Sequence, residues 1–256
     1  MKILFLIIAV FLFQSVFSVE YTGIAKWYTV DDHSGCNLDF DLDGPLLVTA
    51  INNEQYAEGA VCGRCIRVTN NDYDGDPNYV ETLDLLVTSC CPECPKPNLD
   101  LSHKAFARFA DNAVGGLSVT WEYIDCDVTG NYEIKMKNKS NLYWNSFQIR
   151  NNRVDVTNVR IKDRDVWHNT ELQSWNYWDY DPEGTIGENF EVEVTSINGE
   201  KFIDVVPEYI PGDVYVSKHQ FAPSTEKDNV SQCSKNYPLN IIFFIFSILF
   251  IFFSMN

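Results

Sequence analysis

Two pairs of closely spaced cysteines are the first residues in this 256-residue sequence whose types and spacing could do chemistry. Cys62 and Cys65 form one Cys-x-x-Cys pair, and Cys91 and Cys94 form the second. Two such pairs can hold a structural zinc ion, but in a secreted protein disulfides are the default state of cysteine. No strand–helix–strand pattern of the thioredoxin type surrounds either pair, so a redox role has less support. We therefore expect disulfides, and neither a metal nor another cofactor.

The sequence contains eight cysteines, of which seven precede residue 127, so the first half of the chain holds an odd number. Cys90 stands next to Cys91 and is the expected spare. Cys233 is the remaining cysteine; it is either the partner of Cys90 or free for an intermolecular disulfide. Apart from such a link, we expect a monomer.

Asp100 is a carboxylate for which two interpretations are open. It lies in the segment Leu99-Asp100-Leu101-Ser102, directly before a helical pattern. A carboxylate at a helix start stabilises the helix by about 0.5–1 kcal/mol, and the spacing alone favours this structural interpretation. The functional interpretation is a carboxylate at the mouth of a barrel, available to a sugar hydroxyl or a glycosidic oxygen.

The elements that must position these residues read as β-structure in two folded units, at 19–127 and 128–221. In the first unit, apolar and β-branched segments recur between clusters of Gly, Asn, Asp and Pro. One helix is expected after Ser102, which occupies an N-cap position before an apolar face that includes Phe106 and Phe109. The expected strands span 24–30, 46–51, 64–69, 81–88 and 117–124.

The second unit consists of short segments that alternate apolar and polar residues, which predicts a β-sandwich. Phe190–Ser196 has the cleanest period of two, and Asn198-Gly199 supplies a tight turn after it. The other segments are Tyr132–Met136, Ser146–Arg150 and Asn158–Lys162. The unit is also dense in aromatic residues, and we expect Trp167 to lie in the core because it occupies a strand-like stretch.

Charge and the N-terminal segment restrict the compartment and the partners. The formal net charge of −17 argues against nucleic acid and anionic phospholipid as main partners, because both require a cationic face. Residues 1–18 read as a secretory signal peptide with basic Lys2, an apolar core over 3–13 and a small-residue cleavage site ending at Ser18. The body is therefore expected outside the cell.

The C-terminal segment reads as an anchor signal. Residues 222–238 have the polar composition of a stalk, and 239–256 are mostly apolar. The apolar run is shorter than the ~20 residues of a spanning helix, so we favour a glycosylphosphatidylinositol (GPI) attachment signal over a single-pass type I helix. The candidate attachment residues are Asn229, Ser231 and Ser234.

The order of motifs along residues 20–221 resembles the expansins and expansin-like proteins. In the first unit the matching segments are Gly23-Ile24-Ala25-Lys26-Trp27-Tyr28, Cys36, Cys62-Gly63-Arg64-Cys65, Val87-Thr88-Ser89-Cys90-Cys91-Pro92, Leu99-Asp100-Leu101-Ser102-His103-Lys104-Ala105-Phe106 and Val119-Thr120-Trp121-Glu122-Tyr123-Ile124-Asp125-Cys126. In the second unit they are Thr129-Gly130-Asn131-Tyr132, Lys137, Tyr143-Trp144, Phe147-Gln148-Ile149-Arg150-Asn151 and Trp175.

This resemblance implies an all-β protein: a six-stranded double-psi β-barrel with one short helix, followed by an immunoglobulin-like sandwich that binds cellulose. It also implies that Asp100 is the residue most closely tied to wall loosening. It assigns Tyr143, Trp144 and Trp175 to a binding platform, with Lys137 as an adjacent polar contact. The implied disulfides are Cys36–Cys62, Cys65–Cys126 and Cys91–Cys94, which leave Cys90 unpaired.

Three positions depart from the family pattern. Lys26 stands where the family has a threonine, Ser89 where it has a second aspartate, and Cys91 where it has an aromatic residue. Glycoside hydrolysis usually needs two carboxylates, so the loss at Ser89 argues against an enzyme. The hydrolytic alternative requires a partner from the acidic loop after the first strand, which contains Asp31, Asp32, Asp39, Asp41 and Asp43.

We therefore expect a cell-surface expansin-like protein that binds cellulose or a related β-glucan and loosens it without hydrolysis. One alternative is a glycan-cleaving enzyme of the family-45 endoglucanase or lytic transglycosylase type, with Asp100 as the general acid. A second alternative is an inert carbohydrate-binding wall protein. Asn138 and Asn229 begin N-glycosylation motifs, and a glycan on Asn138 would lie close to the expected platform.

Overall fold

The computed structural model describes residues 19–30, 34–39, 47–187 and 189–224, all within one compact unit, Val19–Ser224. None of the helices in these residues combines the length and the apolar character needed to cross a membrane. The expected signal peptide and anchor signal lie outside the described residues. So do Asp31, Asp32, Asp41, Asp43, Asn229, Ser231, Cys233 and Ser234.

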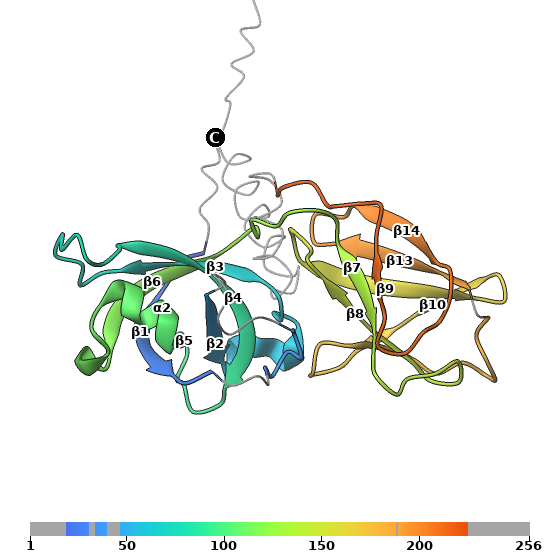
Figure 1. The fold of residues 1–256 in the computed structure, drawn as a ribbon, viewed down its shortest axis with the longest axis horizontal. Coiled ribbons are helices and arrows are strands. Elements are labelled where there is room, and N and C mark those ends of the chain that lie inside the picture. The colour runs from blue at the N-terminus through green and yellow to red at the C-terminus, as the bar shows by residue number, and fades with distance from the viewer. Residues whose placement is uncertain (1–18, 31–33, 40–46, 188, 225–256) are drawn as a thin grey trace, which may run out of the picture. The chain divides into compact units, whose positions relative to one another are not determined.

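Six strands close a barrel in the order β1-β5-β2-β4-β3-β6 (Figure 1). The pairs β1–β5 and β2–β4 are parallel, and the other four pairs are antiparallel. The prediction of a six-stranded barrel is confirmed. Its strands are β1 (Tyr21–Tyr28), β2 (Val48–Asn52), β3 (Cys65–Asn70), β4 (Thr82–Cys91), β5 (Leu99–Ser102) and β6 (Leu117–Ile124).

The local signals around the barrel locate its helix correctly but miss one strand. The expected helix is α2 (His103–Phe109), and the Ser102 Oγ caps it by accepting a hydrogen bond from the Ala105 amide at 3.2 Å. Each of the five predicted segments overlaps one strand, whereas β5 is not predicted by the pattern. The remaining helical turns are α1 (Asn53–Tyr56), η1 (Ala57–Gly59) and η2 (Asn112–Val114).

The barrel core consists of alternate strand residues together with the apolar face of α2. Trp121 is 1% exposed, and its indole N–H donates to the Pro97 carbonyl at 2.8 Å, so its polar atom is satisfied. Phe106 and Phe109 from α2 are buried against the strands. Burial of each such side chain stabilises the fold by about 1.5–3 kcal/mol, so the packed core fixes the positions of the barrel strands.

Nine strands in the second half form two sheets, which confirms the prediction of a sandwich. The four-stranded sheet has the order β10-β9-β13-β14, and the five-stranded sheet has the order β11-β12-β8-β7-β15 (Figure 1). The strands are β7 (Glu133–Met136), β8 (Asn145–Arg150), β9 (Val156–Asp163), β10 (Val166–Asn169), β11 (Glu171–Leu172), β12 (Trp178–Tyr180), β13 (Phe190–Ser196), β14 (Lys201–Val206) and β15 (Val214–Val216).

The alternation of β13 explains how the sandwich is held together. Val192 and Val194 are fully buried in one core cluster with Phe147 from the other sheet and Tyr132, which directly precedes β7. The turn between β13 and β14 places Gly199 at φ +86°, a conformation that favours glycine. The tight turn expected at Asn198-Gly199 is therefore confirmed.

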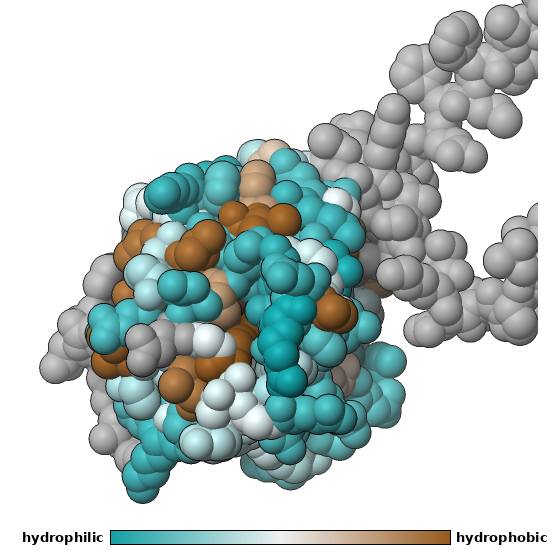
Figure 2. All heavy atoms as spheres, turned by 90° about the vertical axis from the view of Figure 1, so that its right-hand side faces the viewer, coloured by the Kyte–Doolittle hydropathy of each residue, from teal (hydrophilic) through white to brown (hydrophobic). Residues whose placement is uncertain are grey.

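Apolar side chains also reach the surface of the sandwich, where Figure 2 shows groups of hydrophobic residues among hydrophilic ones. The edge strands β14 and β15 contribute β-branched side chains that are 42–57% exposed. Such scattered exposure is common on soluble proteins, so we assign no role to it. These side chains are Ile203, Val205, Val214 and Val216.

The described residues contain three disulfides, Cys36–Cys62, Cys65–Cys126 and Cys91–Cys94, which are the pairs implied by the family resemblance. Within the described residues Cys90 is a free thiol. All four cysteines of the two Cys-x-x-Cys pairs are therefore oxidised, which leaves no thiolate for a zinc ion at either pair.

Charged and polar contacts join the barrel to the sandwich. The Arg64 guanidinium lies 2.6 Å from the Asp155 carboxylate and 3.6 Å from the centre of the Tyr123 ring. Asp39 forms ion pairs with Lys135 and with Arg150, the latter at 2.9 Å. The two halves of the unit are thus bonded directly to each other.

Candidate functional site

Asp100 lies on the short strand β5, which is flanked by β1 and β2. Its register partners are Lys26 on β1 and Ala50 on β2. Leu99 and Leu101 on either side are buried in the barrel core, so alternation directs the Asp100 side chain to the opposite face. The helix-start interpretation of Asp100 is wrong, because the helix begins at His103 and Ser102 is its cap.

The surroundings of Asp100 favour its neutral form. Partial burial raises the pKa of Asp100, the negative charge of Glu93 raises it further, and the positive charge of Lys26 lowers it. One carboxylate oxygen, Oδ1, is buried without a hydrogen-bond partner among the described residues. The side chain as a whole is only partly buried, so the accessible part of the carboxylate is what a ligand in solution can reach.

Glu93 is the second acidic residue of this site, and the sequence interpretation missed it. It is exposed in the turn Cys91-Pro92-Glu93-Cys94, which the Cys91–Cys94 disulfide closes beside Asp100. The two sulfur atoms and an Asp100 oxygen lie within 4.8 Å of one another, but the sulfurs are bonded to each other. The signal in the sequence is the acidic residue inside the Cys91–Cys94 loop, a few residues before Asp100.

Asp39 is the one aspartate of the acidic loop that lies within the described residues, and it does not pair with Asp100. It bonds to Lys135 and Arg150 on the sandwich. These cations hold the pKa of Asp39 below its usual value, so it is committed to an ion-pair network. Ser89 accepts a hydrogen bond from the Gly35 amide at 2.8 Å and carries no acid.

Trp27 is an exposed aromatic residue of the barrel that the sequence interpretation also missed. It is 36% exposed at the end of β1, and its indole N–H donates to the Asn112 carbonyl at 3.0 Å. The His103 ring contacts it edge-on at 5.2 Å. Its position in Lys26-Trp27-Tyr28, beside the predicted groove, was the available signal.

The predicted binding residues of the sandwich lie at the ends of strands of the five-stranded sheet. Lys137 follows β7, Tyr143 and Trp144 precede β8, and Trp175 precedes β12. We call these four residues the aromatic platform. The Tyr143 and Trp175 side chains are 66% and 39% exposed, whereas Trp144 and Lys137 are partly buried.

Asp179 on β12 connects members of the aromatic platform. Burial raises the pKa of Asp179, while a hydrogen bond from the Ser146 hydroxyl, the charge of Lys137 and a hydrogen bond from Trp144 lower it. The Lys137 ammonium lies 5.3 Å from the Trp175 ring centre and 4.4 Å from that of Tyr177. Lys137 therefore contacts the Trp175 ring as a cation and interacts through its charge with Asp179.

The other aromatic residues of the sandwich have different environments. Tyr177 and Trp178 are buried, at 5% and 7% exposure. The prediction that Trp167 belongs to the core is wrong. Trp167 lies on β10 of the other sheet, outside the core cluster, and the Arg160 guanidinium lies 5.2 Å from its ring centre. Alternation on an edge strand does not distinguish the inner face from the outer one.

Comparisons with known proteins found relatives of this chain by sequence and by structure. No protein-family model matches the chain. The chain is 29% identical over 228 residues to expansin-like protein 3 of Dictyostelium discoideum, covering 84% of this chain and 63% of that protein. It is 28% identical over 212 residues to expansin-like protein 5 of the same organism, covering 78% of this chain and 84% of that protein.

Bacterial expansins are similar as well. Expansin-YoaJ of Bacillus subtilis is 25% identical over 209 residues, covering 78% of this chain and 86% of that protein. The crystal structure of apo Clavibacter michiganensis expansin superposes with a TM-score of 0.71 at 21% identity, covering 81% of this chain and 100% of that one. A mutant of that expansin has been solved in complex with cellohexaose, with the same TM-score and coverage. By sequence the chain is similar to expansin-like proteins, and its barrel-and-sandwich fold is that of a bacterial expansin.

Proposed function

We propose that this chain is an extracellular expansin-like protein that binds cellulose or a related wall β-glucan and loosens it without hydrolysis. The aromatic platform carries the proposal, because it exposes Tyr143 and Trp175, and the cation Lys137 lies beside the Trp175 ring. Aromatic rings offer apolar faces to sugar C–H groups, and nearby polar groups bond the hydroxyls. The related Clavibacter fold solved with cellohexaose supports a glucan as the ligand.

The barrel is proposed to engage a single glucan strand at Asp100. Its side chain is partly exposed on the outer face of the barrel strand, and Lys26 lies opposite on β1. A glucan hydroxyl that donates to Asp100 would exchange a glucan–glucan hydrogen bond for a glucan–protein one. Because each hydrogen bond contributes only about 0.5–1.5 kcal/mol net, such an exchange can proceed without breaking a covalent bond.

One observation favours glycan cleavage as a second candidate function. The raised pKa of Asp100 suits a general acid, and Glu93 supplies a second carboxylate close enough to affect that pKa. Against it, Ser89 occupies the position of the family's second aspartate. We therefore rank cleavage below non-hydrolytic loosening.

A single sample of cellulose can separate these functions. We would measure extension of a loaded cellulose strip and release of soluble sugar together, with the chain and its Asp100→Asn variant. Extension without sugar release, lost in Asp100→Asn, is the expected result. Sugar release that disappears in Asp100→Asn would establish cleavage instead. Binding with neither effect would indicate an inert wall protein.

The protein is further proposed to be a monomer held on the outer face of the plasma membrane by a GPI anchor. The support is the polar stalk and apolar tail of the sequence. Phosphatidylinositol-specific phospholipase C should release the protein from intact cells. Retention after that treatment, with release only by detergent, would favour the type I helix.

A further inference from the structure

The turn that carries Trp175 is bonded to its own sheet after that residue, where the Gln148 side chain on β8 donates to the Asn176 carbonyl at 3.1 Å. It joins β11, a strand of only two residues at the sheet edge, to β12. Within the turn, the Gln173 amide donates to the Tyr177 carbonyl at 2.8 Å and the Asn176 amide donates to the Gln173 carbonyl at 2.9 Å. The backbone carbonyls of Ser174 and Trp175 take no part in these two bonds. An edge turn of this kind has many conformations of similar energy unless another element restrains it.

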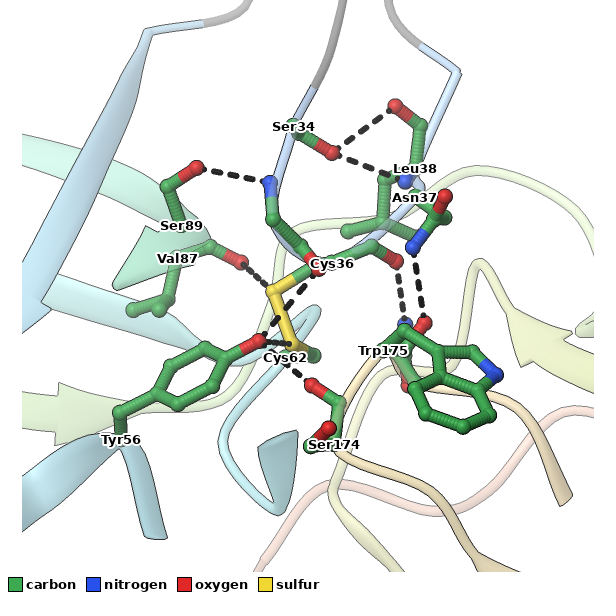
Figure 3. Close-up of a disulfide and its surroundings, with 12 residues drawn as sticks. Ser34, Cys36, Asn37, Leu38, Tyr56, Cys62, Val87, Ser89, Ser174 and Trp175 are labelled. Atoms are coloured by element: carbon green, nitrogen blue, oxygen red, sulfur yellow. Dashed lines mark hydrogen bonds between the residues drawn. A yellow bond between two sulfur atoms is a disulfide. The ribbon is translucent and has the colours of Figure 1, made fainter. Parts of the chain in front are cut away.

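Two side chains of the barrel supply that restraint, as Figure 3 shows. The Tyr56 hydroxyl lies 2.9 Å from the Ser174 carbonyl oxygen, and the Asn37 amide Nδ2 donates to the Trp175 carbonyl at 3.1 Å. A β-carbon added at Gly59 would lie 2.9 Å from the Ser174 oxygen, so only glycine permits this close approach. Consecutive carbonyls of the platform turn are thus bonded to the barrel.

The barrel side of this contact is itself rigid. Asn37 follows Cys36, which is joined to Cys62 by a disulfide and whose amide donates to the Thr88 carbonyl at 2.9 Å. Tyr56 is 7% exposed, and its hydroxyl lies 3.4 Å from the Cys62 sulfur. Burial, followed by the charge of Cys90, raises the pKa of Tyr56 to about 12, so the phenol keeps its proton and remains a donor at neutral pH.

The side chain of Trp175 is held from the other direction by the sandwich. The Lys137 ammonium lies 5.3 Å from its ring centre. The Asn176 side chain, next in the chain, adds a third bond from the turn to the barrel by donating to the Cys36 carbonyl at 3.3 Å. The barrel therefore restrains the backbone of Trp175, and the sandwich lysine restrains its ring. Neither half of the unit determines the orientation of Trp175 by itself.

We propose that Tyr56 and Asn37 are positioning residues for glucan binding, because they hold Trp175 in the orientation that completes the aromatic platform. This inference rests on the proposed function and extends it, since it makes the barrel a structural part of the sandwich's binding surface. Preorganisation of one ring raises affinity by reducing the conformational freedom that is lost on binding.

The test compares Tyr56→Phe with Tyr73→Phe in binding isotherms of the otherwise unchanged chain on microcrystalline cellulose. Each change deletes one phenolic hydroxyl of the barrel; the Tyr73 hydroxyl lies 3.4 Å from the Asp76 carbonyl, a contact within one barrel loop. We expect Tyr56→Phe to raise Kd roughly 3- to 10-fold, the effect of losing one hydrogen bond, and Tyr73→Phe to leave Kd unchanged. Asn37→Gly keeps the left-handed backbone of Asn37 accessible and should act in the same direction.

A double-mutant cycle separates positioning from general destabilisation. If Tyr56 acts through Trp175, then Tyr56→Phe adds no further loss of affinity in a Trp175→Ala background. An equal loss of affinity from Tyr56→Phe in both backgrounds would overturn the inference. It would also be overturned if Trp175→Ala weakens binding while Tyr56→Phe and Tyr73→Phe give the same Kd. Unchanged binding by Trp175→Ala would overturn the platform assignment, and the inference with it.

Discussion

Asp100 and Lys26 lie opposite each other in register across the parallel strands β5 and β1. The candidate groove of this protein therefore pairs its carboxylate with a cation at the position where the family pattern has a threonine. Glu93 adds a second negative charge beside Asp100, so the groove contains three charged groups whose interactions can be measured separately.

Asp100→Asn is expected to stabilise the protein at neutral pH. The folded state raises the pKa of Asp100 above its unfolded value of 3.8, so folding favours the protonated acid. This favourable contribution is fully present below pH 3.8 and is lost as the pH rises through the folded pKa. The variant should gain up to about 1 kcal/mol at pH 7, because the carboxylate stays partly solvated, and nothing below pH 3.8.

Urea denaturation at both pH values measures the effect of Asp100→Asn, with the exposed Asp213→Asn as the matched control. An equal gain at both pH values would show that the effect does not come from the ionised carboxylate. A gain in the free energy of unfolding at neutral pH together with a loss of wall loosening would indicate that Asp100 lowers stability but is needed for function.

Glu93→Gln and Lys26→Thr are expected to move the pKa of Asp100 in opposite directions. Removing the negative charge of Glu93 should lower that pKa, and removing the positive charge of Lys26 should raise it. Carbon-detected NMR titration of the Asp100 carboxyl carbon measures both shifts directly. Shifts of the same sign in the two variants would contradict the proposed arrangement of charges.

Arg64→Ala is expected to destabilise the chain far more than Arg67→Ala. The Arg64–Asp155 pair is largely buried, with side chains 16% and 18% exposed, and its loss leaves Asp155 buried without its cation. We expect a loss of about 3–5 kcal/mol in the free energy of unfolding. The Arg67–Asp84 pair is about half exposed on the barrel surface and should contribute less than about 1 kcal/mol. Equal losses in denaturant unfolding would contradict this difference.

Trp144→Ala combined with Trp175→Ala is expected to reduce retention on microcrystalline cellulose by about tenfold or more. The reason is that each stacked aromatic pair contributes about 0.5–1.5 kcal/mol beyond its burial, and two rings are removed. Trp167→Ala is the matched control, because Trp167 is partly exposed on the opposite sheet. A pull-down of the three proteins at several loadings measures the difference. Retention that falls only in Trp167→Ala would move the binding surface to the four-stranded sheet.

The secondary structure was largely predictable because its signals are local. The alternation of Phe190–Ser196 and the turn at Asn198-Gly199 appear as β13 and the turn that follows it. Ser102 caps α2 as its spacing indicates. In contrast, β5 is four residues long, too short for a period to be recognised, and it exists because β1 and β2 pair with both of its edges.

The sequence alone was therefore sufficient for the sandwich, the helix and, through the resemblance to expansins, the barrel, since periodicity, caps and motif order are recorded along the chain. Only the tertiary structure showed Glu93 beside Asp100, the outward position of Trp167 and the bonds from Tyr56 and Asn37 to the turn of Trp175. These contacts join residues far apart in the chain or depend on which face a strand buries. Closure of the barrel and its packing on the sandwich decide them, and no local pattern encodes that geometry.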